Sequence, residues 1–201
     1  MLLYRDILSG DELFSDAYVS RIYAISSFAQ DQVNARIMLQ FSPSMTPLKL
    51  VDDCAYEVDC TMVTVSEGEV DIGANPSAED GGDEGVESSS QTVNNVVYSF
   101  RLSETSFDKK SYMTYIKGYM KAVKGKLQES NPDRVPDFEK KAATLVKKII
   151  TNFKDYEFYT GESMDPDGMV ALLNYREDGV TPYFTFFKDG LAEEKLVCIW
   201  K

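Results

Sequence analysis

The chain has 201 residues, of which 43% are hydrophobic and 12% aromatic, and this composition predicts one folded domain with a substantial core. It contains no histidine, which removes the usual base of serine and cysteine hydrolases and the commonest zinc ligand. We therefore expect no enzyme of those classes. The net charge of −12 argues against nucleic-acid binding by the whole surface.

The sequence also predicts where the protein resides. No apolar run approaches the ~18 residues of a membrane-spanning helix, so no membrane span is expected. Arg5 and Asp6 interrupt what would be the apolar region of a signal peptide. The odd number of cysteines, without a C-x-x-C pair, favours a reducing cytosol, with Cys54 and Cys60 as core thiols.

The N-terminal part is expected to be mainly β. Residues 2–9, LLYRDILS, resemble a strand, and residues 9–16, SGDELFSD, a polar connection. A short amphipathic helix is permitted within 19–46 by apolar residues at four-residue spacing, Val33, Ile37 and Phe41. Residues 48–65, LKLVDDCAYEVDCTMVTV, alternate between apolar and polar as a half-buried strand does.

A long acidic segment follows. Residues 67–91, EGEVDIGANPSAEDGGDEGVESSSQ, are rich in Gly, Ser and acids and cannot bury enough apolar surface to offset their ordering entropy. They are expected to form a mobile loop. Residues 50–100 as a whole contain twelve acids and no lysine or arginine. Residues 92–106, TVNNVVYSFRLSETS, are expected to return to a strand.

An antiparallel helical hairpin is predicted over residues 105–153. The first helix is expected to start near Thr105 or Ser106, with Asp108 in its first turn and an apolar stripe that the second helix covers. Asn131-Pro132 breaks the chain, and the second helix runs from about Asp133 or Pro136 to Asn152. Residues 105–155 hold twelve Lys and Arg against six acids, so the hairpin is basic within an acidic protein.

Three Asp-Gly pairs within residues 161–190 permit three interpretations: a calcium loop, a phosphate cradle or strand-connecting turns. An EF-hand alignment from Ser163 places Asn174 where a bidentate Glu is required, and no G-x-x-x-x-G-K-[ST] string exists. Asp-Gly between β runs predicts hairpin turns, hence a β-meander. A weak surface carboxylate site for calcium stays open as an alternative.

Several long strings resemble the translationally controlled tumour protein family: IGANPSAEDGGDE (72–84), FKDYEFYTGESMDPDGMVALLNY (153–175), REDGVTPYFTFFKDGL (176–191) and the N-terminal MLLYRDILSGDELFSDAY. The resemblance implies an α+β fold, a tent-like β-sheet assembly with a protruding helical hairpin and a mobile acidic loop. Such a fold is similar to a zinc-dependent guanine-nucleotide-release chaperone, here without zinc. The chain would be one domain over 1–201, with 19–46 as an insertion relative to the family pattern.

The resemblance also implies a function. It implies a cytosolic, cytoskeleton-associated protein that is not an enzyme. Such a protein would bind calcium weakly, associate with microtubules, and control growth and survival through protein partners that include antiapoptotic regulators. One alternative is nucleotide exchange or release on the small GTPase Rheb, and a second is an extracellular histamine-releasing role after non-classical secretion. The resemblance assigns Glu12 to the GTPase contact and Cys198 to an intermolecular disulfide, and leaves the calcium ligands unassigned. It assigns the tubulin contact to five lysines, Lys109, Lys110, Lys117, Lys121 and Lys124.

Overall fold

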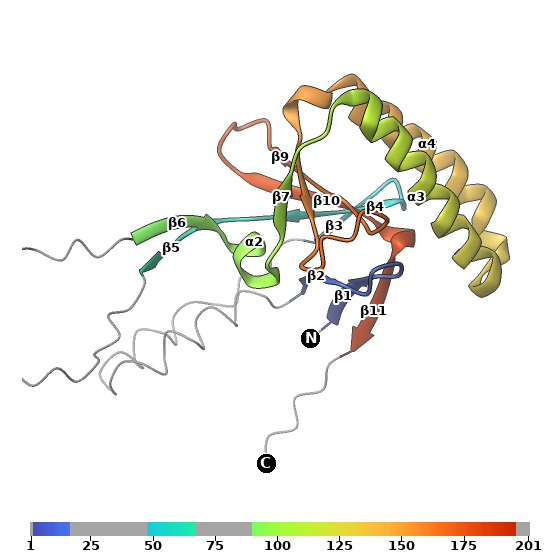
Figure 1. Ribbon diagram of the computed structural model, residues 1–201, viewed down its shortest axis with the longest axis horizontal. Helices are drawn as coiled ribbons and strands as arrows, with labels where there is room; N and C mark the ends of the chain where they lie inside the picture. The colour runs from blue at the N-terminus through green and yellow to red at the C-terminus, as the bar shows by residue number, and fades with distance from the viewer. Residues whose placement is uncertain (1, 17–47, 67–89, 196–201) are drawn as a thin grey trace, which may run out of the picture.

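The computed structural model describes residues 2–16, 48–66 and 90–195, and these form a mixed α and β fold (Figure 1). The described helices are α2 (Asn95–Phe100), α3 (Lys109–Ser130) and α4 (Val135–Thr151). The described strands are β1 (Leu2–Asp6), β2 (Glu12–Ser15), β3 (Leu48–Val51), β4 (Ala55–Asp59), β5 (Met62–Ser66), β6 (Ser90–Asn94), β7 (Ser103–Thr105), β8 (Glu157–Thr160), β9 (Ala171–Tyr175), β10 (Pro182–Phe187) and β11 (Leu191–Lys195). The predicted α+β class is confirmed.

The largest sheet has six antiparallel strands in the order β3-β4-β10-β9-β8-β7. Consecutive strands β8, β9 and β10 are neighbours, so the predicted meander is confirmed. Gly179 has φ of 67° in the turn between β9 and β10, a conformation that glycine adopts without steric cost. Phe184 and Phe186 of β10 are fully buried and form the centre of the core.

A smaller sheet, in the order β11-β1-β2, joins the two ends of the described chain. Phe14 of β2 stacks on Tyr4 at 4.3 Å and on Phe186 at 4.5 Å between ring centroids, so the two sheets share one aromatic core. The prediction of a polar connection over residues 9–16 was wrong in part, because residues 12–15 form strand β2. Leu13 and Phe14 of this strand are both only 1% exposed.

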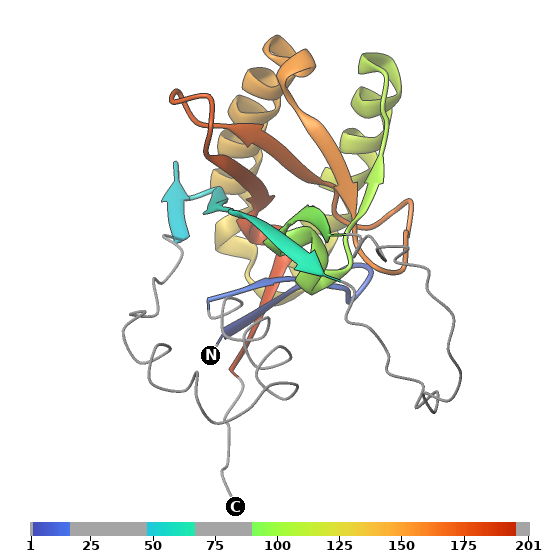
Figure 2. The ribbon, with the colours of Figure 1, turned by 90° about the vertical axis from the view of Figure 1, so that its left-hand side faces the viewer.

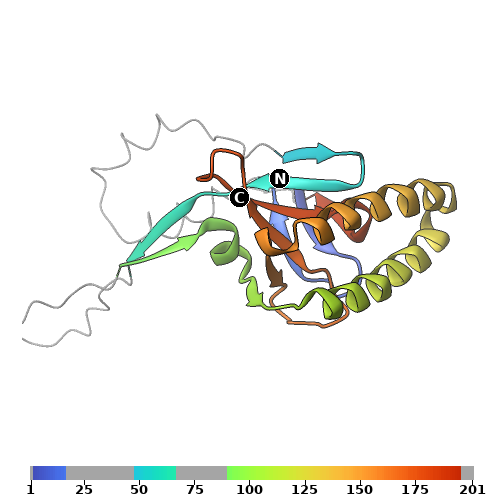
Figure 3. The ribbon, with the colours of Figure 1, turned by 90° about the horizontal axis from the view of Figure 1, so that it is seen from above.

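Two further expectations about strands were also too simple. Residues 48–65 hold three strands rather than one, with β3 and β4 paired across the turn that contains Asp52 and Asp53. Residues 92–106 are interrupted by α2, whose first turn is capped by Asn94, an acceptor from the Val96 N–H at 2.9 Å. Strands β5 and β6 form a separate two-stranded ribbon, which extends on the side opposite the helical hairpin (Figure 3).

The predicted helical hairpin is present, with narrower bounds than 105–153. Helix α3 starts at Lys109, because Asp108 is its N-cap and Thr105 belongs to β7. A 3₁₀ turn at Pro132–Arg134 connects it to α4, and Figure 2 shows both helices behind the large sheet. Tyr112 of α3 packs on Phe158 of β8 with ring centroids 5.2 Å apart, which anchors the hairpin to the core.

Some of the predictions concern residues that lie outside the described part of the chain. These include the insertion at 19–46 and most of the acidic loop at 67–91, of which only Ser90 and Gln91 are described, in β6. Among the helices of the described residues, none is long and apolar enough to cross a membrane.

Candidate protein-docking surface on the helical hairpin

The start of α3 fixes the position of its first two lysines. The Asp108 carboxylate accepts hydrogen bonds from the backbone N–H groups of Lys110 at 3.1 Å and Ser111 at 3.3 Å, so the helix begins at Lys109. Lys109 and Lys110 are exposed in this first turn. Cations at a helix N-terminus oppose the helix dipole, so helix stability does not account for these two lysines.

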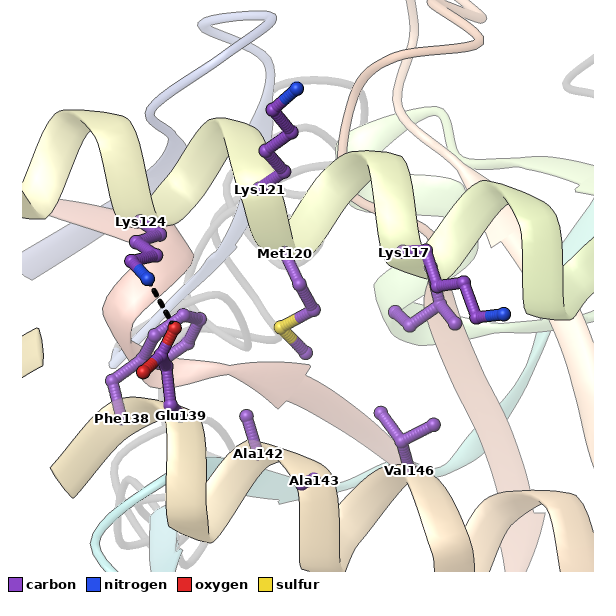
Figure 4. Close-up of a pocket in the computed structure, with 10 residues that line it drawn as sticks. Lys117, Met120, Lys121, Lys124, Phe138, Glu139, Ala142, Ala143 and Val146 are labelled. Carbon is purple, nitrogen blue, oxygen red and sulfur yellow. Dashed lines mark hydrogen bonds and ion pairs between the residues drawn. The ribbon is translucent and has the colours of Figure 1, made fainter. Parts of the chain in front are cut away.

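An open groove of about 480 Å³ lies between the two helices. Apolar side chains of both helices line it, including Ile116 and Met120 of α3 and Phe138 and Val146 of α4. The small side chains of α4, Ala142 and Ala143, leave space opposite Met120 (Figure 4). The expectation that the second helix covers the apolar stripe of the first is therefore only partly right. Ile116, Phe138 and Ala142 are buried at the base of the groove. Met120 and Val146 are half-buried and Ala143 is exposed, so a narrow strip of apolar surface stays open.

Three of the five predicted lysines line this groove: Lys117, Lys121 and Lys124. Lys124 forms an ion pair of 2.5 Å with Glu139 of α4 across one end of the groove (Figure 4). Lys117 and Lys121 are exposed and form no ion pair with another described residue. Their ammonium groups are therefore available to an acidic partner.

The turn of the hairpin is held on the large sheet by a cluster of ion pairs. The Arg134 guanidinium contacts the carboxylates of Asp53 and Asp189, the latter at 3.0 Å. Lys141 of α4 lies 3.1 Å from Asp53, and Lys188 lies 2.5 Å from it. Hydrogen bonds from Arg134, Lys188 and Lys141 hold the pKa of Asp53 well below its usual range. This cluster fixes the orientation of α4.

The backbone of the β3–β4 turn directs the two acids toward α4. Asp52 and Asp53 have φ of 51° and 52°, in the left-handed region that Asp tolerates better than most residues. The Asp52 carboxylate contacts Lys148 at 3.0 Å. Sequence reasoning missed the cluster, because Asp53 and Arg134 are 81 residues apart and no local pattern connects them.

Comparison with known proteins identifies the family. The sequence model of the family described as translationally controlled tumour protein matches residues 1–192. The chain belongs to this family. A translationally-controlled tumor protein homolog of Schizosaccharomyces pombe is 62% identical over 196 residues, which cover 97% of this chain and 99% of the relative. A homolog of Saccharomyces cerevisiae is 56% identical, with 98% of this chain and 100% of the relative covered.

Solved structures of the translationally controlled tumour protein family agree with this fold. The tumor-associated protein p23fyp of Schizosaccharomyces pombe matches with a TM-score of 0.72 and 61% identity, covering 98% of this chain and all of that one. The Caenorhabditis elegans family member, solved by NMR, matches with a TM-score of 0.63 and 30% identity at the same coverage. The antiparallel sheets and the helical pair are thus features of the family.

Glu12, the residue assigned by resemblance to a GTPase contact, lies on a different element from the lysines. It begins β2, an edge strand of the three-stranded sheet, whereas the lysines lie on α3 (Figure 1). Its carboxylate accepts a hydrogen bond from Arg5 at 2.9 Å, and Arg5 also contacts Glu194 at 3.2 Å. The Glu12 side chain is 38% exposed, so it is accessible to a partner although it is paired.

The Asp-rich stretch between β8 and β9 forms turns in which carboxylates bind the backbone. The Asp167 N–H donates to Asp165 Oδ1 at 2.9 Å, and the Met169 N–H donates to buried Asp6 at 2.9 Å. Strands rather than helices flank the EF-hand alignment that starts at Ser163. Within residues 2–16, 48–66 and 90–195, no three acids, histidines or cysteines are grouped to hold a metal ion.

The cysteines do not form a reactive site within the described residues. Cys54 and Cys60 are buried free thiols, as predicted. Burial raises the pKa of Cys54 to about 11 and that of Cys60 to about 12, so neither is a thiolate at neutral pH. Cys198, assigned to an intermolecular disulfide, lies outside the described residues.

Proposed function

We propose that this protein acts by binding rather than by catalysis, as a cytoplasmic, microtubule-associated regulatory protein that also binds calcium weakly. The observation that carries the proposal is the exposed basic side of α3. Lys117 and Lys121 stand unpaired among the described residues in a protein whose net charge is −12. Tubulin surfaces are acidic, so attraction between opposite charges would bring the hairpin to the microtubule.

The physical nature of these contacts sets the expected affinity. Exposed ammonium groups each contribute little, and salt screens them within ~8 Å at physiological ionic strength. Binding through the lysines alone would therefore be micromolar at best and would weaken as the salt concentration rises. Lys124 contributes less than Lys117 and Lys121, because Glu139 already neutralises its charge.

Co-sedimentation with microtubules tests the proposal. A variant with Lys117→Glu and Lys121→Glu should lose co-sedimentation and keep its circular dichroism spectrum, because both side chains are exposed. The matched control carries Lys49→Glu and Lys195→Glu, which make the same charge change at exposed positions on β3 and β11. Equal loss in both variants would mean that only net charge matters, and co-sedimentation that survives in the first variant would place the contact elsewhere.

A second proposal concerns the small GTPase Rheb, with nucleotide exchange or release promoted through Glu12. Its support is the accessible acid on the edge strand β2. Exchange factors act by stabilising the nucleotide-free GTPase, so the role requires no catalytic base. A nucleotide-release assay with the variant Glu12→Lys tests this proposal. Glu194→Lys is the control, because Glu194 is the other acid that contacts Arg5. A loss of activity in the first variant alone would indicate a direct contact through Glu12 and not a local charge effect. Release at the uncatalysed rate by the unaltered protein would reject this proposal.

A further inference from the structure

We propose that the groove between α3 and α4 docks a short amphipathic helix of a partner protein, with an apolar stripe and acidic residues along one flank of that stripe. The first support is the composition of the groove. Its floor and walls are apolar, while its rim on the α3 side carries Lys117 and Lys121. Apolar surface left in water between two well-formed helices is stabilised when another apolar surface covers it.

The dimensions of the groove favour a helix as its occupant. On α3 it extends from Ile116 to Lys124, and on α4 from Phe138 to Val146. Each of these stretches rises by ~12 Å along its helix axis at 1.5 Å per residue. A helix that presents apolar residues at i, i+3 or i+4, and i+7 spans ~10 Å between its outermost anchors. Two turns of an incoming helix therefore match the length of the groove.

The charges around the groove specify the sign and the side of the partner's acidic flank. All three lysines that line the groove belong to α3, and the single acid, Glu139, belongs to α4. Because Lys124 is paired with Glu139, Lys117 and Lys121 are the two available cations. They are four residues apart and so lie on one face of α3. Two acids on the docked helix, spaced by one turn, would meet them.

The two alanines of α4 make close approach possible. Ala142 is 2% exposed and forms part of the packed base of the groove, whereas Ala143 is exposed at its mouth (Figure 4). Small residues at a helix surface allow another helix to come near, and a larger side chain there would occupy the same space. Ala143→Leu should therefore fill the groove from its exposed side without disturbing the core.

The test uses the full chain and a synthetic probe, since the natural partner is not needed to measure the chemistry. The probe is a fluorescent helical peptide of about 16 residues, roughly four turns, with leucines at i, i+4 and i+7 and glutamates on one flank. One comparison peptide has the same composition with the leucines spread around the helix, and another keeps the glutamates without leucines. We expect the probe to bind at least ~10-fold more tightly than either, because one buried leucine is worth that factor.

Variants of the protein then locate the bound peptide. Ala143→Leu should weaken probe binding roughly 10-fold, because it denies space to one buried leucine, and should leave the salt dependence of binding unchanged. Lys117→Gln with Lys121→Gln should weaken binding and flatten its salt dependence. Lys109→Gln with Lys110→Gln, the matched control on the same helix outside the groove, should have little effect. Circular dichroism and thermal unfolding check that each variant is folded.

Two results would overturn the inference: equal binding of the glutamate-only peptide, or probe binding that is unaffected by Ala143→Leu in a folded variant. The first result would mean that the protein attracts acidic peptides in general, without using the apolar groove. The second would mean that the peptide binds elsewhere on the protein. The inference does not rest on microtubule association. If the probe fails to bind while co-sedimentation still depends on Lys117 and Lys121, the groove proposal fails and the microtubule proposal stands.

Discussion

Removing the charge of Asp53 should destabilise the protein far more than removing that of its neighbour Asp52. Both residues have left-handed backbones in the same turn, and asparagine tolerates this conformation as well as aspartate does. Asp53→Asn and Asp52→Asn are therefore matched in backbone and in chemistry. They differ only in the surroundings of the carboxylate, because Asp53 lies among three cations and Asp52 contacts one exposed lysine.

The structure sets the size of the difference. A hydrogen bond to a charged group is worth about 1.5–3 kcal/mol when it is shielded from water. The Asp53 side chain is 39% exposed, although its partner Arg134 is only 18% exposed, and this exposure reduces the benefit. Arg134 also keeps its contact with Asp189 in the variant. We therefore expect Asp53→Asn to cost about 1–2 kcal/mol and Asp52→Asn only a few tenths of a kcal/mol.

Urea unfolding followed by circular dichroism measures both values, and its pH dependence provides a second check. The pKa of Asp53 is lowered in the folded state, so the charge stabilises the fold fully above the unfolded pKa of about 3.9. That contribution is lost as the pH falls through the folded pKa. The gap in unfolding free energy between the unaltered protein and Asp53→Asn should be constant at neutral pH and should shrink below about pH 4.

Equal losses for the two variants would refute the claim that Asp53 holds the hairpin turn on the sheet. A loss at Asp53 that does not change down to strongly acidic pH would refute the electrostatic cause, since a change in packing alone has no such dependence. Lower hydrogen-exchange protection of α4 in Asp53→Asn than in Asp52→Asn would identify the element that the cluster holds.

Three other predictions can be tested on the purified protein. A Cβ at Gly190 would lie 2.0 Å from the Tyr119 hydroxyl oxygen, so Gly190→Ala should cost about 1–3 kcal/mol in urea unfolding, whereas Gly125→Ala, with open space in the middle of α3, should stabilise by about 0.5–1 kcal/mol. Because burial raises their pKa values, Cys54 and Cys60 should react with a thiol reagent at pH 8 only after unfolding, and rapid labelling of the native protein at either position would contradict this. Calcium should bind with a dissociation constant of about 10⁻⁴ M or weaker, since the described residues gather no metal-binding group, and submicromolar binding in calorimetry would show that a formed site exists.

The sequence predicted best those elements whose signals are local. Apolar residues at helical spacing, with Asn131-Pro132 between them, located both long helices to within a few residues. The three-strand meander followed from Asp-Gly pairs between apolar runs. Both signals depend on residues a few positions apart, so no knowledge of tertiary contacts is required.

The elements that were missed depend on contacts distant in the chain. Leu13 and Phe14 are adjacent yet both buried, so β2 shows no alternation, and its short length among polar residues concealed it. Helix α2 contains β-branched residues that favour a strand, and the Asn94 cap and the left-handed Arg101 overrode that preference. For the candidate site, three of the five predicted lysines, Lys117, Lys121 and Lys124, line the groove, and their role as a tubulin contact stays a prediction. The groove itself was not predicted, because its depth depends on how α4 packs against α3.

The pairing of β1 with β11 has a consequence for how the chain folds during synthesis. Leu3 of β1 lies opposite Glu194 of β11. The three-stranded sheet therefore cannot form completely until β11 has been synthesised. Such distant pairings are slow to form, whereas α3 and α4, neighbours along the chain, can associate early. As the polypeptide leaves the ribosome, β1 and β2 therefore present an open strand edge until residues 191–195 emerge. An open strand edge can pair with another chain, and a truncation before β11 would leave this edge permanently open.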